Sequence, residues 1–135
     1  MKKVLYLLLL CTTSLVVSCK KEADREQFIG TYNVSQSCGG GQNSNYQITI
    51  SESGEGESVS INNFANLGFQ VKGVCNGTTI VFTPQTGTAP VDGTPVTFNT
   101  SGGEGTLNNG VLTIPFSFTG SNGWAATCTM SCSQQ

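Results

Sequence analysis

The residues best suited to chemistry in this sequence are its six cysteines, and their spacing favours disulfides over metal binding. Four of them, Cys38, Cys75, Cys128 and Cys132, follow residue 27. Structural zinc sites usually use C-x-x-C pairs or histidines, and the chain has neither. We therefore expect two disulfides among these four cysteines, with three possible pairings, and neither a metal site nor another cofactor.

The sequence lacks the side-chain combinations of common catalytic sites. It has no histidine, which excludes Ser-His-Asp triads, Cys-His pairs and histidine-based metal sites. Its carboxylate cluster, Glu52, Glu55 and Glu57, lies in a Ser/Gly-rich stretch that is typical of an exposed turn. We interpret the cluster as a solvated acidic hairpin, with a weak calcium site or a glycosidase pair as alternatives. The prediction is that the protein is not an enzyme.

Residues 1–18 have the pattern of an export signal. Lys2 and Lys3 precede a mostly apolar stretch over residues 4–17. This stretch is shorter than the roughly 20 residues that span a bilayer, and it suits a secretory hydrophobic region of about 7–15 residues. Residues 15–19, Leu-Val-Val-Ser-Cys, resemble the lipobox of bacterial lipoproteins. That resemblance implies cleavage before Cys19 and lipidation of Cys19; an ordinary signal peptide and a single-span anchor are the alternatives.

The lipoprotein resemblance also implies a location. More than one acyl chain on Cys19 makes membrane anchoring stable, whereas a single chain binds marginally. Residue 20 is Lys rather than Asp, which in this family favours the outer membrane over the inner membrane. Residues 20–27 contain no large apolar side chain, so we expect 19–27 to be a lipidated, solvated tether and 28–135 to be the domain.

The composition of the domain argues against nucleic-acid binding and favours strands. Lys72 is the one basic residue after position 27, so the basic surface that nucleic acids require is missing. Gly, Ser, Thr and Asn are abundant, which suits short strands and tight turns. Apolar residues alternate with polar ones, most clearly at Leu112, Ile114, Phe116 and Phe118. This two-residue period is typical of half-buried strands.

Alternation and Asn-Gly turn signals together predict an all-β domain. About eight antiparallel strands are expected, at residues 30–37, 45–51, 58–62, 69–75, 78–84, 95–107, 111–118 and 124–132. The strand at 95–107 carries a bulge at 101–103, and Pro115 must lie at a bulge or an open seam because it lacks an N–H. Eight strands joined by hairpins indicate an up-and-down barrel or a closely related sandwich.

The start of this domain resembles a known family. Residues 28–32, Phe-Ile-Gly-Thr-Tyr, resemble the opening of lipocalin-like proteins, in which G-x-W begins the first strand, with Tyr32 in place of the tryptophan. The stretch 28–135 is also similar to small lipocalin-like lipoproteins of Gram-negative bacteria, through an early cysteine, the segment 63–68 and a late cysteine strand. The resemblance implies a lipocalin-like barrel, although the arginine that closes such barrels is not evident near the C-terminus.

A closed barrel also suggests how the cysteines pair. Its first and last strands are neighbours, which favours a Cys38–Cys128 bridge. Cys75 lies at the hairpin end of the fourth strand, at the same end as the chain terminus, which favours Cys75–Cys132. By strand alternation all four sulfurs point inward.

The up-and-down path gathers candidate binding residues at one end of the barrel. Because the first strand starts at the tether, alternate connections lie at the far end, namely 38–44, 63–68, 85–94 and 119–123. Loops on a rigid scaffold and barrel mouths are common ligand sites. The candidate binding residues at this far rim are Gln42, Asn43, Tyr46, Phe64, Asn66, Asp92, Asn122 and Trp124. The alternative for Tyr46, Phe64 and Trp124 is that they fill the core.

These features predict a membrane-anchored, non-enzymatic binding module of the cell envelope. It is attached through the N-terminal lipid, and its partner is expected to be an envelope protein, a glycan or a small apolar ligand. An inhibitor of a secreted hydrolase is the alternative, with the loop 38–45 as its protruding element.

The substitution Cys19→Ala is expected to abolish labelling with radioactive palmitate and to leave an uncleaved precursor, because it removes the thiol that carries the first lipid. Labelling and electrophoretic mobility measure both effects. Cys11→Ala is the matched control. Cys11 lies within the signal, so its substitution should leave palmitate labelling and cleavage unchanged. Palmitate incorporation that persists in Cys19→Ala would exclude Cys19 as the acylated residue.

Overall fold

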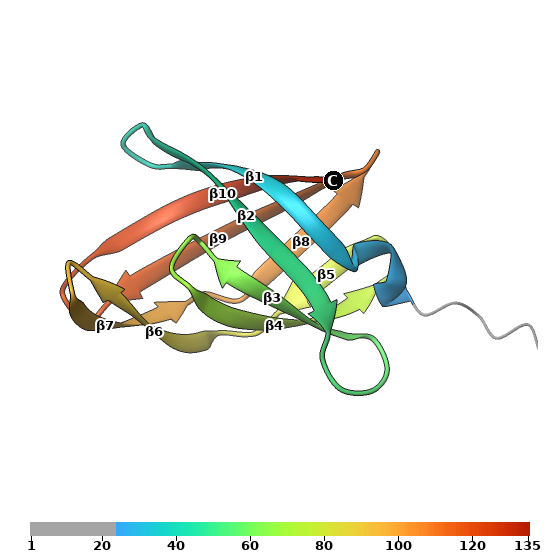
Figure 1. Cartoon of the computed structure of the whole chain (residues 1–135), viewed down its shortest axis with the longest axis horizontal. Coiled ribbons are helices and arrows are strands. Elements are labelled where there is room, and N and C mark those ends of the chain that lie inside the picture. The colour runs from blue at the N-terminus through green and yellow to red at the C-terminus, as the bar shows by residue number, and fades with distance from the viewer. Residues whose placement is uncertain (1–23) are drawn as a thin grey trace, which may run out of the picture.

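The computed structural model describes residues 24–135, which form a 3-10 helix followed by ten strands (Figure 1). The helix is η1 (Asp24–Phe28). The strands are β1 (Gly30–Cys38), β2 (Gln42–Glu52), β3 (Ser58–Phe64), β4 (Phe69–Asn76), β5 (Thr79–Phe82), β6 (Gln85–Val91), β7 (Thr94–Thr100), β8 (Gly103–Asn108), β9 (Val111–Gly120) and β10 (Ala125–Gln134). The expected export signal and Cys19 lie outside the described residues. Within 24–135, η1 is far too short to cross a bilayer, and no membrane-spanning helix is found.

Eight of the strands close into an antiparallel barrel. Their order is β10-β1-β2-β3-β4-β5-β8-β9, and β9 pairs with β10 to complete the circle. Every strand pair is antiparallel, and most neighbours are consecutive in the chain. The predicted all-β, up-and-down barrel is therefore confirmed, and its closure distinguishes it from a sandwich.

The hairpin of β6 and β7 corrects the strand assignment made from the sequence. Residues 85–91 were expected to belong to a connection, but they form β6, and the turn is only Asp92-Gly93. The pairing Phe82↔Gly103 continues as Gln85↔Thr100 without a shift, so β5 and β6 run in line beside β8 and β7. Residues 85–91 lack the apolar–polar alternation that predicts a strand, because β6 buries only Ala89.

Two local breaks explain why each of these long strands is divided. Pro84 lies between β5 and β6 and has no N–H for the ladder. The side-chain amide of Gln85 replaces the missing bridge to β4, donating to the Lys72 carbonyl (2.6 Å) and accepting from the Lys72 N–H (2.8 Å). Between β7 and β8, Gly102 approaches the Phe82 carbonyl so closely that an added Cβ would lie 2.9 Å from that oxygen.

The bulge expected at residues 101–103 is also present. From Thr100↔Phe118 to Thr106↔Thr113 the chain advances six residues on the β7–β8 side and five on β9. One extra residue on one side of a ladder defines a bulge. Pro115 lies in this interval of β9, which accommodates its missing N–H.

Inward side chains fill the barrel. Six phenylalanines pack together in the half of the barrel farther from η1. Their ring centroids lie 4.8 Å apart for Phe64 and Phe116 and 5.6 Å apart for Phe98 and Phe118. At the other end Phe28 and Tyr32 are fully buried, and the Tyr32 hydroxyl donates to the Phe28 carbonyl (3.0 Å). A small barrel filled in this way leaves ligand binding to its ends.

Residues 24–27 dock onto the barrel, which corrects the expectation that they belong to a solvated tether. The Asp24 carboxylate accepts the Gly77 N–H (2.9 Å). The Arg25 N–H donates to Glu57 (2.8 Å), and its guanidinium donates to the Gly54 carbonyl (3.0 Å) and pairs with Glu52 (3.2 Å). Polar side chains of the segment thus satisfy turn groups in place of water. Two of the three clustered glutamates hold this cap, so the acidic hairpin is not simply solvated.

The Cys38–Cys128 disulfide forms as predicted, at a directly paired position of β1 and β10 with Cα atoms 4.0 Å apart. The expected Cys75–Cys132 bridge does not form, and both residues are buried free thiols. The reason is topological: β4 and β10 are four places apart in an eight-stranded barrel and so stand on opposite walls. Burial raises the pKa of Cys75 to about 11 and that of Cys132 to about 12, which keeps both thiols protonated at neutral pH.

Removal of the disulfide is expected to lower the free energy of unfolding by about 4–5 kcal/mol, because the bond closes a loop of 90 residues in the unfolded chain. Urea unfolding of Cys38→Ala/Cys128→Ala against wild type measures the loss. The control is Cys75→Ala/Cys132→Ala, which should remain sensitive to reductant because it retains the bond. A control variant that reductant no longer destabilises would show that the structural disulfide is the other pair.

Candidate binding site at the barrel rim

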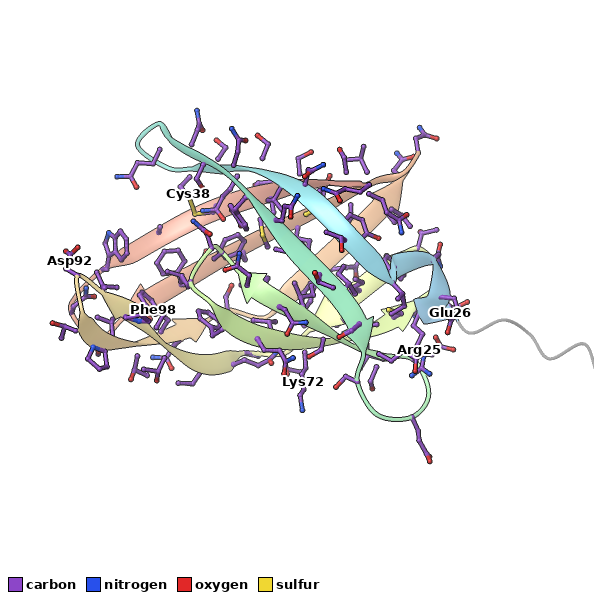
Figure 2. All side chains as sticks on the ribbon, viewed as in Figure 1. Arg25, Glu26, Cys38, Lys72, Asp92 and Phe98 are labelled. Carbon is purple, nitrogen blue, oxygen red and sulfur yellow. A yellow bond between two sulfur atoms is a disulfide. The ribbon has the colours of Figure 1, made fainter. Side chains whose placement is uncertain are left out.

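The two ends of the barrel differ in what covers them. Helix η1 lies against the turns around Gly54 and Gly77 and covers one end. The opposite end, called the rim here, carries the turns 39–41, 65–68, 92–93 and 121–124. Figure 2 shows Arg25 at the first end and Asp92 at the second. The strands therefore place these turns as the up-and-down path predicted.

The rim connections are shorter than the sequence suggested. Residues 42–44 and 85–91 were expected to be loop, but residues 42–44 extend β2 and residues 85–91 form β6. The β1–β2 and β6–β7 hairpins consequently project at the rim (Figure 1). The walls of the rim are thus made from strand backbone rather than from long flexible loops.

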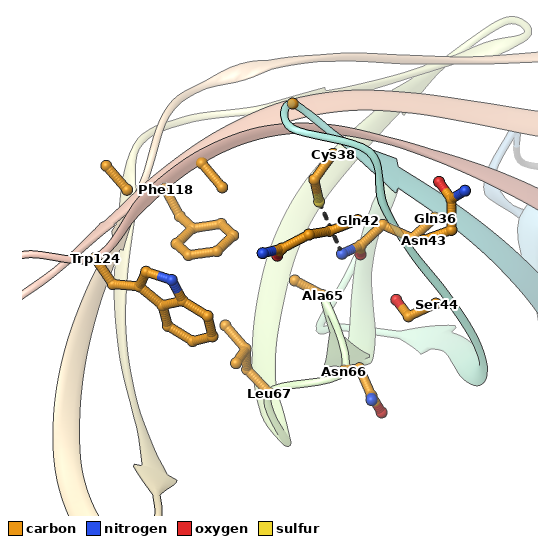
Figure 3. Close-up of a pocket in the computed structure, with 13 residues that line it drawn as sticks. Gln36, Cys38, Gln42, Asn43, Ser44, Ala65, Asn66, Leu67, Phe118 and Trp124 are labelled. Carbon is orange, nitrogen blue, oxygen red and sulfur yellow. Dashed lines mark hydrogen bonds between the residues drawn. The ribbon is translucent and has the colours of Figure 1, made fainter.

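A hollow of about 350 Å³ lies at the rim among the β1–β2 hairpin, the β3–β4 turn and the β9–β10 turn (Figure 3). It is lined by Gln36, Cys38, Gly39, Gln42, Asn43, Ser44, Ala65, Asn66, Leu67, Phe118, Trp124, Ala125 and Ala126. Four of the eight candidate residues meet here, namely Gln42, Asn43, Asn66 and Trp124. They come from three separate parts of the chain.

The other four candidates lie elsewhere. Phe64 is only 2% exposed and belongs to the core, which corrects its assignment to a binding surface. Tyr46 is half-buried and donates its hydroxyl to the lining residue Gln36, but it does not itself line the hollow. Asp92 and Asn122 line a second rim hollow that also includes Trp124, and the Asn122 carbonyl oxygen accepts the Trp124 N–H (3.1 Å).

Sequence reasoning missed Gln36, Phe118 and the small residues of the lining. Strand alternation could have identified Gln36, since it shares the inward face of β1 with Tyr32 and Val34. It is 8% exposed. Its amide is held between the Tyr46 hydroxyl and the Cys38 sulfur, 3.3 Å from the Gln36 nitrogen. A polar residue at an inward strand position indicates a polar floor, because a buried amide must find partners.

Trp124 is the sole tryptophan of the chain and is held firmly although 45% exposed. Its ring centroid lies 6.3 Å from that of Phe98 and 6.1 Å from that of Phe118, the second in an edge-to-face arrangement. Such contacts stabilise aromatic pairs by about 0.5–1.5 kcal/mol beyond burial. One part of the indole is thereby fixed by the core while the rest faces the hollow.

The polar groups around the hollow are free to bind. Within residues 24–135, no hydrogen bond engages the side chains of Gln42, Asn43 or Asn66, or the indole N–H of Trp124. No lining residue carries a charge. Nor does any group of three His, Cys, Asp or Glu side chains in the described part of the chain suit a metal ion. The arrangement offers hydrogen bonds and an aromatic surface.

The β3–β4 turn that supplies Asn66 has an unusual backbone. Ala65 and Asn66 have φ angles of 55° and 59°, the left-handed region that non-glycine residues seldom occupy. The turn is held by the Asn63 carbonyl, which accepts from Asn66, and by the Asn63 side chain, which accepts from Gly68 (both 3.1 Å). Left-handed residues kept by such bonds recur at ligand sites.

Comparison with known proteins supports the fold and leaves the activity open. The sequence matches no known protein family and no curated protein. The structure is similar to a redesigned beta barrel, b11L5F_LGL, with a TM-score of 0.51 and 18% identity over 83% of this chain and 95% of that one. A second redesigned barrel, mFAP1 bound to DFHBI, gives 0.47 and 15% identity over 84% and 100%. The chain is thus a small closed antiparallel β-barrel.

The core and rim aromatics are expected to differ in their effect on stability. Phe64→Ala should lower the free energy of unfolding by about 3–5 kcal/mol, because it leaves a cavity among packed rings. Trp124→Ala should lower it by about 1–2 kcal/mol, since much of the indole is already in water. Urea unfolding measures both, with the exposed Gln42→Ala as a control that changes stability by less than about 0.5 kcal/mol. Equal losses for the two aromatic variants would contradict this division.

Proposed function

We propose that this chain is an outer-membrane lipoprotein, anchored through acylated Cys19, whose barrel acts as a non-enzymatic binding module. The observation that carries the proposal is the rim hollow, which the side chains of Gln42, Ser44 and Trp124 face with unoccupied hydrogen-bonding groups (Figure 3). Pockets with an apolar wall and a few convergent polar groups are the usual form of a ligand site. Lipid attachment is supported by the lipobox at residues 15–19.

The position of the hollow suits an anchored protein. The chain enters the barrel through η1 at the end opposite the rim (Figure 1). A lipid on Cys19 places the η1 end toward the membrane and the hollow away from it. The partner is an envelope protein, a glycan or a small apolar ligand that approaches from the aqueous side.

A lipocalin-like relationship is part of the proposal. It is supported by residues 28–32, in which the buried Tyr32 lies near the start of β1 where that family has tryptophan, and by the up-and-down path of the strands. The base of this barrel is covered by Arg25 of η1 rather than by an arginine near the C-terminus.

A second candidate function is inhibition of a secreted hydrolase. One observation favours it: the β1–β2 hairpin projects at the rim and its base is fixed to β10 by the Cys38–Cys128 disulfide. Protease inhibitors characteristically present a preorganised segment, since rigidity lowers the entropic cost of binding. The projecting tip, residues 39–41, is Gly-Gly-Gly and offers backbone rather than side chains.

Capture from the envelope fraction with the intact lipoprotein tests the proposed function. The wild type is expected to retain a glycan or protein that Trp124→Ala releases, because this change removes one wall of the hollow. Glu55→Ala is the matched control, since Glu55 is an exposed turn residue at the η1 end. Capture that depends on Glu55 and not on Trp124 would place the binding surface at the wrong end. A captured hydrolase that loses activity on binding would favour the inhibitor.

A further inference from the structure

The lining of the rim hollow selects for a neutral ligand. None of its thirteen residues is charged, and Gln36, Gln42, Asn43, Ser44 and Asn66 supply its polar side chains. An ionised ligand group would lose water there without gaining a counter-charge, which is unfavourable. Acids, phosphates and amines therefore fit this site poorly.

The polar groups that face the hollow select for hydroxyl groups. Gln42 and Ser44 share the face of β2 that turns toward the hollow, whereas the Asn43 and Asn66 side chains point away from it (Figure 3). The Gln42 carboxamide and the Ser44 hydroxyl each donate and accept, as a ligand hydroxyl does, and the Trp124 indole adds an N–H donor. The set favours a polyhydroxylated molecule.

Trp124 adds the apolar part of the recognition. Figure 3 shows its indole beside Phe118, with Leu67 below and Gln42 reaching toward Phe118 from the other side. The π-face of an indole is negative, and C–H groups next to oxygen are weakly positive, so a ring with C–H groups on one face stacks on it favourably. Because Phe98 and Phe118 hold the indole, little side-chain entropy is lost on stacking.

The depth of the hollow limits the ligand further. Its floor is formed by the buried residues Gln36, Ala65 and Phe118, next to the packed phenylalanines of the core. The volume of about 350 Å³ lies at the small end of the roughly 300–1,000 Å³ range of ligand pockets. A long acyl chain has no channel to enter at this floor, whereas a compact ring rests on it.

We propose that the rim hollow binds a neutral carbohydrate, with a sugar ring stacked on Trp124 and its hydroxyls bound by Gln42 and Ser44. This inference rests on the proposed function and names the ligand class of the same site. Because the hollow opens at the rim, a longer glycan can continue outward from the bound ring.

Titration calorimetry with the purified, intact protein tests the inference. The probes are neutral oligosaccharides of glucose, galactose, mannose and N-acetylglucosamine, together with oligogalacturonate as an acidic sugar and palmitate as an apolar ligand. At least one neutral sugar is expected to bind and to change the fluorescence of the sole tryptophan. Trp124→Ala should weaken that binding by at least about tenfold, and Gln42→Ala/Ser44→Ala by at least about fivefold. Glu55→Ala should leave it unchanged.

Three outcomes overturn the inference. Binding of palmitate or oligogalacturonate alone would show that the ligand is apolar or acidic. Neutral-sugar binding that survives both rim variants would place the carbohydrate elsewhere. Absence of binding by every neutral sugar, with envelope capture still dependent on Trp124, would reject a carbohydrate ligand and leave the binding module intact. Capture that no longer depends on Trp124 would reject the proposed function itself.

Discussion

The antiparallel pairing of β1 with β10 is the constraint on which the rest of the structure depends. It runs from Tyr32↔Gln134 to Cys38↔Cys128 and joins the two ends of the sheet. Without it the sheet would have two open edges and its inner face would meet water. The disulfide lies at the rim end of this seam and fixes the base of the β1–β2 hairpin, so a single covalent bond both reinforces the closed seam and holds one wall of the hollow.

The two ends of the barrel differ in how their polar groups are satisfied. At one end Arg25 binds Glu52 and the Gly54 carbonyl, and charged groups satisfy one another and the turns. At the rim, the side-chain amides of Gln42, Asn43 and Asn66 have no hydrogen-bond partners in the described chain, and Trp124 lines two hollows. The η1 end, where charged groups are paired, is suited to support the barrel. The rim, where amides lack partners, is suited to ligand recognition.

The aromatic core connects these two properties. Phe98 and Phe118 belong to the barrel interior, yet they are also what holds Trp124 in place at the rim. Phe118 in addition forms part of the floor of the hollow. Packing that stabilises the barrel therefore preorganises the surface offered to a ligand, which reduces the ordering cost of binding.

Local patterning was enough to predict most of the fold. Alternation such as that of Leu112 to Phe118, with hairpin turns, implied the strands, the barrel, the bulge and the Cys38–Cys128 bridge between the end strands. It missed β6, which buries little, and it paired Cys75 with Cys132 although they stand on opposite walls. Only the tertiary structure decided that Gln36 and Phe118 line the hollow and that Phe64 does not. The shape of a cavity depends on which strands meet around it, and that information is not local in the chain.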